Sequence, residues 1–131
     1  MISAPKGVLR LATLKMLSES SLSGVGLANE ISRVTSGEWK PGPGSVYLIL
    51  GELLKKGLIT ELTKREGNTR RYIISGKGKT ELERMTKGIE GEVVRQLKVL
   101  AVCSFLAGKS DLERKVRGLA ESIGPSGAPS G

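Results

Sequence analysis

The chain contains no histidine and only one cysteine, Cys103, among its 131 residues. Without histidine it lacks the most common general base of enzymes and the most common ligand of zinc. One cysteine cannot form an intramolecular disulfide, and no cluster of metal ligands or paired nucleophile and base stands out. These absences exclude most small enzymes and metalloproteins. They predict no catalytic residue, no metal site and no cofactor.

Long apolar runs are also missing. No segment reaches the roughly 18 apolar residues of a membrane-spanning helix, and the N-terminus lacks the order of a signal peptide. Hydrophobic residues make up 38% of the chain and charged residues 26%, which is typical of a globular protein. We therefore expect a cytoplasmic protein with no membrane partner.

Positive charge, by contrast, is in excess. The chain has 21 lysines and arginines against 13 acidic residues, which gives a formal net charge of +8. Lysine and arginine neutralise phosphates and release counterions, so this excess favours a nucleic-acid partner. The alternative interpretation is that the charge serves solubility alone.

Apolar periodicity and turn residues predict a series of helices and strands. In chain order these are helices over 5–19, 24–35 and 44–56, strands over 58–63 and 70–75, a helical region over 80–107 that is interrupted at Gly88 and Gly91, and a last helix over 110–123. Three helices followed by two strands is the order of a winged helix. The predicted fold class is mostly α with a small β-wing: a winged helix-turn-helix followed by C-terminal dimerisation helices.

The predicted domains are a winged-helix DNA-binding domain over 1–78, a helical dimerisation segment over 79–123 and a disordered tail over 124–131. Residues 99–107, VLAVCSFLA, are apolar almost all round, which predicts burial on all sides. The helix expected over 89–107 is too apolar to face water alone, so it should pair with a second subunit and with helix 5–19. The residues expected in this contact are Val94, Leu97, Leu100, Ala101, Phe105, Leu112 and Leu119.

The most distinctive local sequence, PGPGSVY over residues 41–47, is a stiff lead-in to an apolar helix. The free N–H groups of a helix N-terminus attract phosphate, and glycine lets a DNA backbone approach closely. Ser45 and Tyr47 can donate hydrogen bonds to phosphate oxygens. Taken alone, however, the motif favours simple helix capping with Tyr47 packed on the core.

Further motifs change that interpretation. They are Gly24, Trp39-Lys40-Pro41, Gly44-Ser45-Val46-Tyr47, the segment from Leu53 to Ile59, Arg70-Arg71-Tyr72, Ser75, Gly78 and Leu82. In residues and spacing, from residue 7 to about 85, the chain resembles the PadR family of transcriptional regulators. The resemblance implies that helix 44–56 lies in the major groove of DNA and that the two strands form a basic wing beside it.

Few side chains on helix 44–56 could identify a base. Glu52 could accept a hydrogen bond from a cytosine amine, and Leu48 could contact a thymine methyl group. On the wing, Arg70 and Arg71 leave opposite faces of a strand, and we expect Arg71 to be the freer of the two. The residues expected to contact DNA are Lys40, Gly44, Ser45, Tyr47, Leu48, Glu52, Lys55, Lys64, Arg65, Arg70 and Arg71.

Three other features receive structural interpretations. The segment Gly78-Lys79-Thr80 looks like the end of a nucleotide-binding loop, but Ile73 stands where that motif needs glycine, so nucleotide binding is rejected. Trp39 could stack on a planar effector, but its place in the lead-in loop favours packing. Cys103 is interpreted as a core residue rather than a redox sensor.

The sequence thus predicts a non-enzymatic regulator that binds double-stranded DNA sequence-selectively as a homodimer, with repression as the expected mode. A small-molecule effector of unknown class is a further candidate partner. The alternative is a winged-helix assembly module whose basic wing binds an acidic protein.

Overall fold

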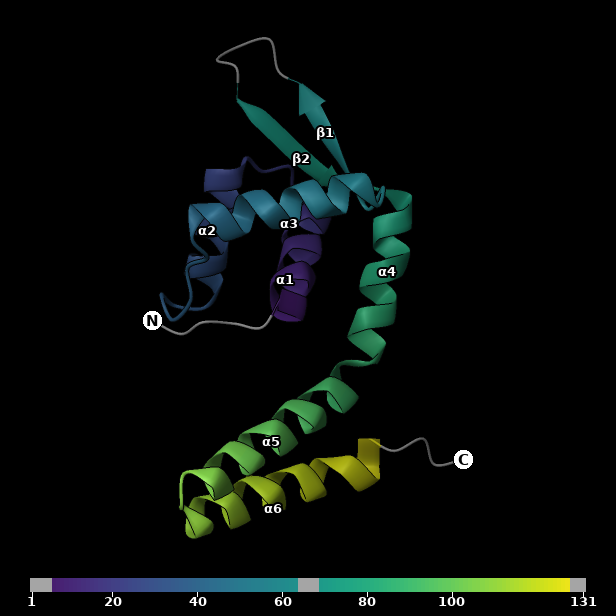
Figure 1. The fold of residues 1–131 in the computed structure, drawn as a ribbon. Helices are drawn as coiled ribbons and strands as arrows, with labels where there is room; N and C mark the ends of the chain where they lie inside the picture. Colours follow the sequence, from purple (N-terminus) through teal and green to yellow (C-terminus); the bar gives the residue numbers. More distant parts are fainter. Residues whose placement is uncertain (1–5, 64–68, 128–131) are drawn as a thin grey trace. The chain divides into compact units, whose positions relative to one another are not determined.

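The computed structural model describes residues 6–63 and 69–127, which form two units, Met1–Arg84 and Met85–Gly131 (Figure 1). The elements in chain order are α1 (Lys6–Glu19), α2 (Gly24–Val34), α3 (Pro43–Lys55), β1 (Ile59–Thr63), β2 (Arg70–Ile74), α4 (Gly76–Lys87), α5 (Ile89–Leu106) and α6 (Ser110–Gly127). The predicted fold class, mostly helical with a small antiparallel wing, is confirmed. No helix within these ranges is long and apolar enough to cross a membrane.

The core of the first unit lies between α1, α2 and α3. Helix α1 contacts both other helices and β2, which explains why its apolar residues occupy more than one face. Helix α2 begins where the hydroxyl of Ser23 accepts a hydrogen bond from the amide of Gly26, at 3.0 Å. It ends before Ser36 and Gly37, which both have positive φ angles. The most deeply buried side chains of this core are Leu14, Leu17, Leu27, Ile31 and Leu53.

Trp39 belongs to the same core. The side chain of Trp39 is buried. The hydroxyl of Thr35 accepts a hydrogen bond from the backbone amide of Trp39 and donates one to the backbone carbonyl oxygen of Trp39. These contacts fix the chain that leads from α2 into α3. The interpretation of Trp39 as a packing residue is confirmed.

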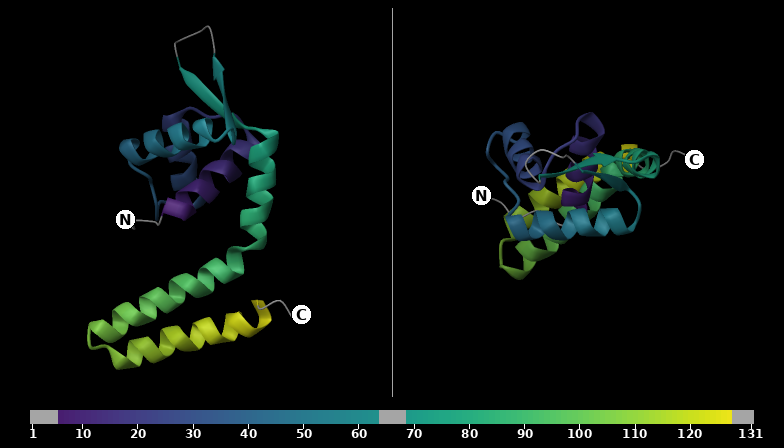
Figure 2. Two further views of the ribbon diagram at one scale, coloured as in Figure 1. Left: turned by 45° about the vertical axis from the view of Figure 1, so that its right-hand side comes forward. Right: turned by 90° about the horizontal axis from the view of Figure 1, so that it is seen from above.

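The wing consists of β1 and β2, which pair antiparallel with Ile59 opposite Ile74 and Thr63 opposite Arg70. The pair projects from the three-helix layer (Figure 2). Leu22, in the turn between α1 and α2, forms a β-bridge with Tyr72 through two backbone hydrogen bonds of 2.8 and 3.0 Å. The base of the wing is therefore attached to the start of α2 as well as to the end of α3.

The second unit is a helical hairpin of α5 and α6, joined by a turn in which Gly108 has a φ of +75°. Within the single chain only Ala101 and Ser104 of residues 99–107 are buried, so the predicted burial of this segment on all sides depends on a second subunit. Phe105 is 59% exposed and Cys103 is exposed as well, so Cys103 is not a core residue of the single chain. The reason is that α6 covers only one side of α5.

Two boundaries differ from the sequence predictions. The interruption predicted at Gly88 is confirmed, but α5 continues through Gly91 without a break, and α4 already begins at Gly76. Helix α6 continues through residues 124–127, where a tail was predicted, while residues 128–131 lie outside the described part.

Candidate nucleic-acid interface

The outer face of α3 is exposed along its length, while Val46, Ile49, Leu50 and Leu53 are buried beneath it. Ser45, Leu48 and Lys55 lie on this outer face, as the sequence predicted. Tyr47 is 78% exposed, so the alternative of a core tyrosine is wrong. The ring and hydroxyl of Tyr47 are therefore available to a partner.

The N-terminus of α3 is open. Gly42 is the N-cap residue, no side chain caps the first turn, and Pro43 occupies the first helical position. Nothing lies within 4 Å of the place where a Cβ of Gly44 would be. The first amide groups of α3 and its positive dipole end can thus be approached by an anion.

Glu52 lies apart from the other predicted contact residues. Its Oε2 is 3.2 Å from the Nη2 of Arg10 on α1, and both side chains are about three-quarters buried, with 25% and 26% exposed. A base that bonded to this carboxylate would have to compete with Arg10. The ion pair ties α3 to α1, and sequence reasoning had no signal for it because the two residues are 42 positions apart.

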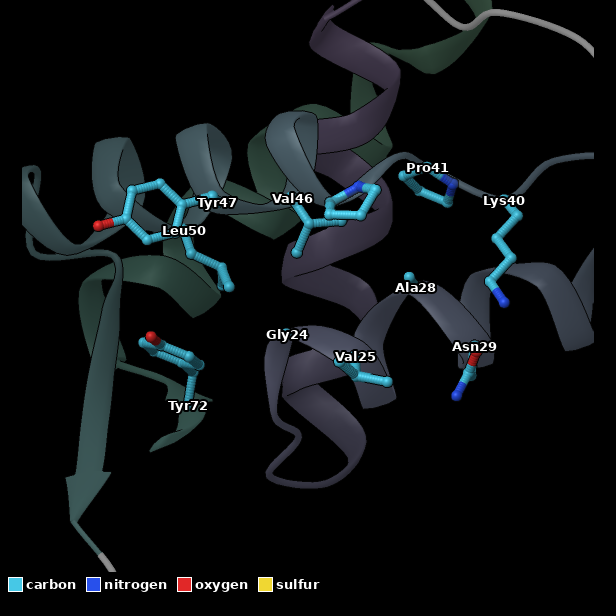
Figure 3. A pocket seen from close by; sticks show the side chains of 11 residues that line it. Gly24, Val25, Ala28, Asn29, Lys40, Pro41, Val46, Tyr47, Leu50 and Tyr72 are labelled. Atoms are coloured by element: carbon cyan, nitrogen blue, oxygen red, sulfur yellow. The ribbon is translucent and has the colours of Figure 1, made fainter. Parts of the chain in front are cut away.

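A hollow of about 360 Å³ opens beside the start of α3 (Figure 3). It lies between the first turns of α2, the lead-in loop and α3, with Tyr72 of β2 at one end. Most of its lining is apolar. The lining residues are Gly24, Val25, Ala28, Asn29, Lys40, Pro41, Pro43, Val46, Tyr47, Leu50 and Tyr72.

The two wing arginines differ in their surroundings. Arg71 donates hydrogen bonds to the carbonyl oxygen and the hydroxyl of Ser21, at 2.6 and 3.2 Å, and is half-buried. Arg70 is 72% exposed and lies 3.4 Å from Glu61 on the neighbouring strand. The expectation that Arg71 is the freer arginine is wrong, because the turn between α1 and α2 packs against its side of the strand. Lys64 and Arg65 lie outside the described residues.

The residues predicted for dimerisation fall into two groups. Leu100, Phe105, Leu112 and Leu119 are at least half exposed. Val94 and Leu97 are half-buried on the side of α5 that carries Ala101, which is fully buried within the hairpin and has no surface left for a second chain. Val93, Val99, Val102 and Leu106 are exposed as well; the last three lie in the apolar run 99–107 that predicted the contact, whereas Val93 was not predicted. The signal for Val93 was its position seven residues before Leu100, which is a predicted contact residue.

Two surface glutamates have shifted pKa values. A hydrogen bond from Arg33 lowers the pKa of Glu30, and one from Arg84 lowers the pKa of Glu81. In each pair the two residues are three positions apart on the same helix and the arginine is about 70% exposed, so each pair contributes little to stability. Across residues 6–63 and 69–127 no group of three or more potential metal ligands comes together.

The family model of the "Transcriptional regulator PadR-like family" matches residues 13–84, which include the whole of α2, α3 and the wing. The transcriptional regulator YqjI of Escherichia coli (strain K12) is 29% identical over 108 residues. That match covers 82% of this chain but 51% of the relative, so the chain spans about half the length of the curated relatives it matches.

Solved structures share the fold. A transcriptional regulator from Clostridium thermocellum has a TM-score of 0.66 at 20% identity, covering 73% of this chain and 97% of that one. A PadR-like transcriptional regulator from Bacillus cereus has a TM-score of 0.53 at 27% identity, covering 70% and 92%. Bacillus subtilis PadR, solved in complex with operator DNA, has a TM-score of 0.54 at 17% identity, covering 91% and 99%.

Proposed function

We propose that this chain, which belongs to the PadR-like family of transcriptional regulators, binds double-stranded operator DNA as a homodimer and represses transcription. The members of this family are transcriptional regulators rather than enzymes. The observation that carries the proposal is the exposed face of α3 with its open N-terminus, which has Lys40 before it and Ser45, Tyr47 and Lys55 along it.

The proposed mode of binding follows from the chemistry of that face. Lys40, Ser45 and the first amides of α3 would hold backbone phosphates, and Leu48 would contact a thymine methyl group in the major groove. Arg70, exposed on the wing, would add a further phosphate contact. Since few side chains can identify a base, selectivity would depend heavily on the shape of the DNA. Bacillus subtilis PadR, whose fold is similar, was solved with its operator DNA.

The homodimer is proposed from the hairpin of α5 and α6. Its exposed apolar side chains, among them Leu100, Phe105 and Leu119, would lie in water if the hairpin remained unpaired. A twofold dimer would present two copies of α3 to a pseudo-palindromic site, with half-sites about one helical turn apart.

Selection from random duplexes, followed by titration of the selected and a scrambled duplex across a salt series, tests the function. We expect tighter binding to the selected duplex and a steep fall of affinity with salt for both. Sedimentation of the complex should give two chains per duplex. If no duplex binds at any salt concentration, the DNA-binding proposal is wrong and an assembly module with an acidic protein partner is favoured.

A further inference from the structure

A second hollow of the winged-helix unit lies between α1, the end of α3 and the start of α4 (Figure 1). Its volume is about 360 Å³, and its lining residues are Arg10, Lys55, Lys56, Leu58, Lys77 and Glu81. We propose that this basic hollow binds a phosphate group, which is supplied either by a free phosphorylated anion or by the backbone of DNA. The first source is independent of the proposed function, whereas the second rests on it.

Positive charge exceeds negative charge around the basic hollow. Arg10 and three lysines line it, while the acid in its lining is Glu81. Both carboxylate oxygens of Glu81 already accept hydrogen bonds from Arg84, at 2.9 and 2.6 Å. These bonds lower the pKa of Glu81 most, and the charges of Arg10 and Lys56 lower it further. The three lysines, by contrast, form no ion pair within residues 6–63 and 69–127.

One donor group of the lining has no partner. The Nη2 of Arg10 lies 3.2 Å from Oε2 of Glu52, but the Nε of Arg10 is buried and forms no hydrogen bond in the described part of the chain. A buried donor that stays unpaired is costly, so such groups normally bind ordered water or an anion. Because Arg10 lines the hollow, an anionic oxygen bound there can supply the missing acceptor. Exposed lysines alone would favour a merely solvated surface, and the unpaired Nε of Arg10 favours a bound anion instead.

The two turns that carry the lysines are fixed against each other. Gly57, in the turn that ends α3, has a φ of +74°, and its carbonyl oxygen accepts a 2.6 Å hydrogen bond from the hydroxyl of Ser75. The same hydroxyl accepts a 3.0 Å hydrogen bond from the amide of Gly78 in α4. The side chain of Lys77 passes this turn, since a Cβ on Gly57 would lie 3.9 Å from Cδ of Lys77. The start of α4 and the end of α3 thus need no rearrangement to receive a ligand, which reduces the cost of binding.

Helix dipoles explain only part of this cluster of cations. Lys55 and Lys56 stand at the C-terminal end of α3, where the negative end of the dipole favours a cation even without a ligand. Lys77 is the second residue of α4, where the positive end of the dipole disfavours a cation. An anion in the hollow would offset both the charge of Lys77 and the dipole of α4.

A phosphate group matches the donors of the basic hollow. Its several anionic oxygens can accept from the Nε of Arg10 and from more than one lysine at once. Lys55 belongs both to the lining of the hollow and to the outer face of α3. A duplex bound to that face would bring its own phosphates to the edge of the hollow, so DNA is one of the two sources.

Inorganic pyrophosphate is the probe for a free anion. It is titrated into the full chain at constant ionic strength, and NMR follows the Nε–H signals of the arginine side chains. The signal of Arg10 should shift. Those of Arg33 and Arg117 should not, because their Nε groups already donate to glutamates of their own helices, at 2.9 and 2.8 Å. Calorimetry gives the affinity.

Lys56→Gln combined with Lys77→Gln removes two charges from the basic hollow. Both lysines are exposed, so this double variant should fold, and it should weaken pyrophosphate binding at least about tenfold. The matched control is Lys87→Gln combined with Lys109→Gln, which removes two exposed lysines from the second unit. The control should change the affinity by less than about twofold, because screening weakens the effect of distant charges.

The second source is tested with the selected and the scrambled duplex across the salt series. If DNA supplies the phosphate, the double variant should lower the salt slope by about two relative to its control, for both duplexes alike. If a free anion supplies it, the slope stays the same and only pyrophosphate binding falls. Equal pyrophosphate affinities together with equal salt slopes in the double variant and its control would overturn the site. If the parent binds no duplex at all, the proposed function fails, and the pyrophosphate titration alone decides whether the basic hollow binds phosphate.

Discussion

Arg71 and Ser21 are 50 residues apart in the chain, yet two hydrogen bonds join them, one from Nη2 to the Ser21 carbonyl oxygen and one from Nε to its hydroxyl. Together with the β-bridge between Leu22 and Tyr72, these bonds attach the wing to the turn before α2. The guanidinium of Arg71 is thus held within the protein, while that of Arg70 faces solvent. Adjacent arginines on one strand therefore have different roles.

Replacement of the two arginines should separate those roles. Arg70→Ala should weaken binding to specific and random duplexes alike, lower the salt slope by about one and leave the melting temperature unchanged. Arg71→Ala should instead lower the stability by about 1–3 kcal/mol, because it removes charge-assisted hydrogen bonds and leaves the Ser21 carbonyl without its partner. Salt titrations and thermal melts of both variants measure this. The opposite pattern, with the slope change in Arg71→Ala alone, would mean that Arg71 leaves Ser21 to contact DNA.

Gly78 should tolerate no side chain. A Cβ at this position would overlap the carbonyl oxygen of Leu58 and lie 2.7 Å from Cγ1 of Ile74. We expect Gly78→Ala to destabilise the winged-helix unit by about 3 kcal/mol, because the start of α4 must move away from the strands.

Gly76→Ala is the matched control for Gly78→Ala, since nothing lies within 4 Å of the Cβ it would introduce. This change in the first turn of the same helix should be neutral or stabilise by up to about 1 kcal/mol. Urea unfolding of both variants compares them. Equal stabilities would show that α4 does not pack on Leu58 in solution.

The exposed apolar side of the α5–α6 hairpin should govern the oligomeric state. Leu100→Lys places a charge in the proposed interface and should shift sedimentation from dimer to monomer. Val34→Lys, at a similarly exposed apolar residue of α2, should leave the dimer intact. A dimer that persists in Leu100→Lys and also in Leu119→Lys would place the subunit interface elsewhere.

Binding and stability should be nearly independent of pH around neutrality, because the chain has no histidine. Arg33 and Arg84 lower the pKa values of Glu30 and Glu81, so the native state favours their ionised forms. The contribution of these two pairs to the stability of the native state is complete above the ordinary glutamate pKa. It disappears as the pH falls through the lowered pKa of the native state. The melting temperature should thus be constant from about pH 7.5 to 5.5 and should fall only in more acidic buffer.

Arg84→Gln provides the control for this pH profile. Without its hydrogen-bond donor, the pKa of Glu81 returns towards its ordinary value, and the contribution of this pair is absent at every pH. The variant should have a slightly lower melting temperature near neutrality and a smaller loss in acid. A steep change of melting temperature between pH 5.5 and 7.5 in the parent would contradict the account.

Prediction from the sequence was most successful for features that depend on local, periodic patterns of residues. The helices and strands, the exposed face of α3 around Ser45 and Leu48, and the packing role of Trp39 followed from apolar spacing, turn residues and a motif. Elements end within a few residues of their predicted bounds because glycine, proline and capping side chains act on neighbouring residues.

Prediction from the sequence failed for contacts between residues that are far apart in the chain. Strand alternation placed Arg70 and Arg71 on opposite faces but could not tell that Ser21 would cover the face of Arg71. The apolar residues 99–107 contact only α6 within the second unit, so their expected burial on all sides stays a prediction about the dimer.

By itself, then, the sequence determined the order of elements, the family and the side of α3 that faces outward, because these depend on short-range periodicity and on residue types at fixed spacings. Only the tertiary structure decided which arginine is free, that Arg10 engages Glu52, and that α2, the lead-in loop and α3 enclose a hollow. Such contacts depend on how separate elements pack in three dimensions, and the spacing of residues along the chain does not determine which distant residues come together.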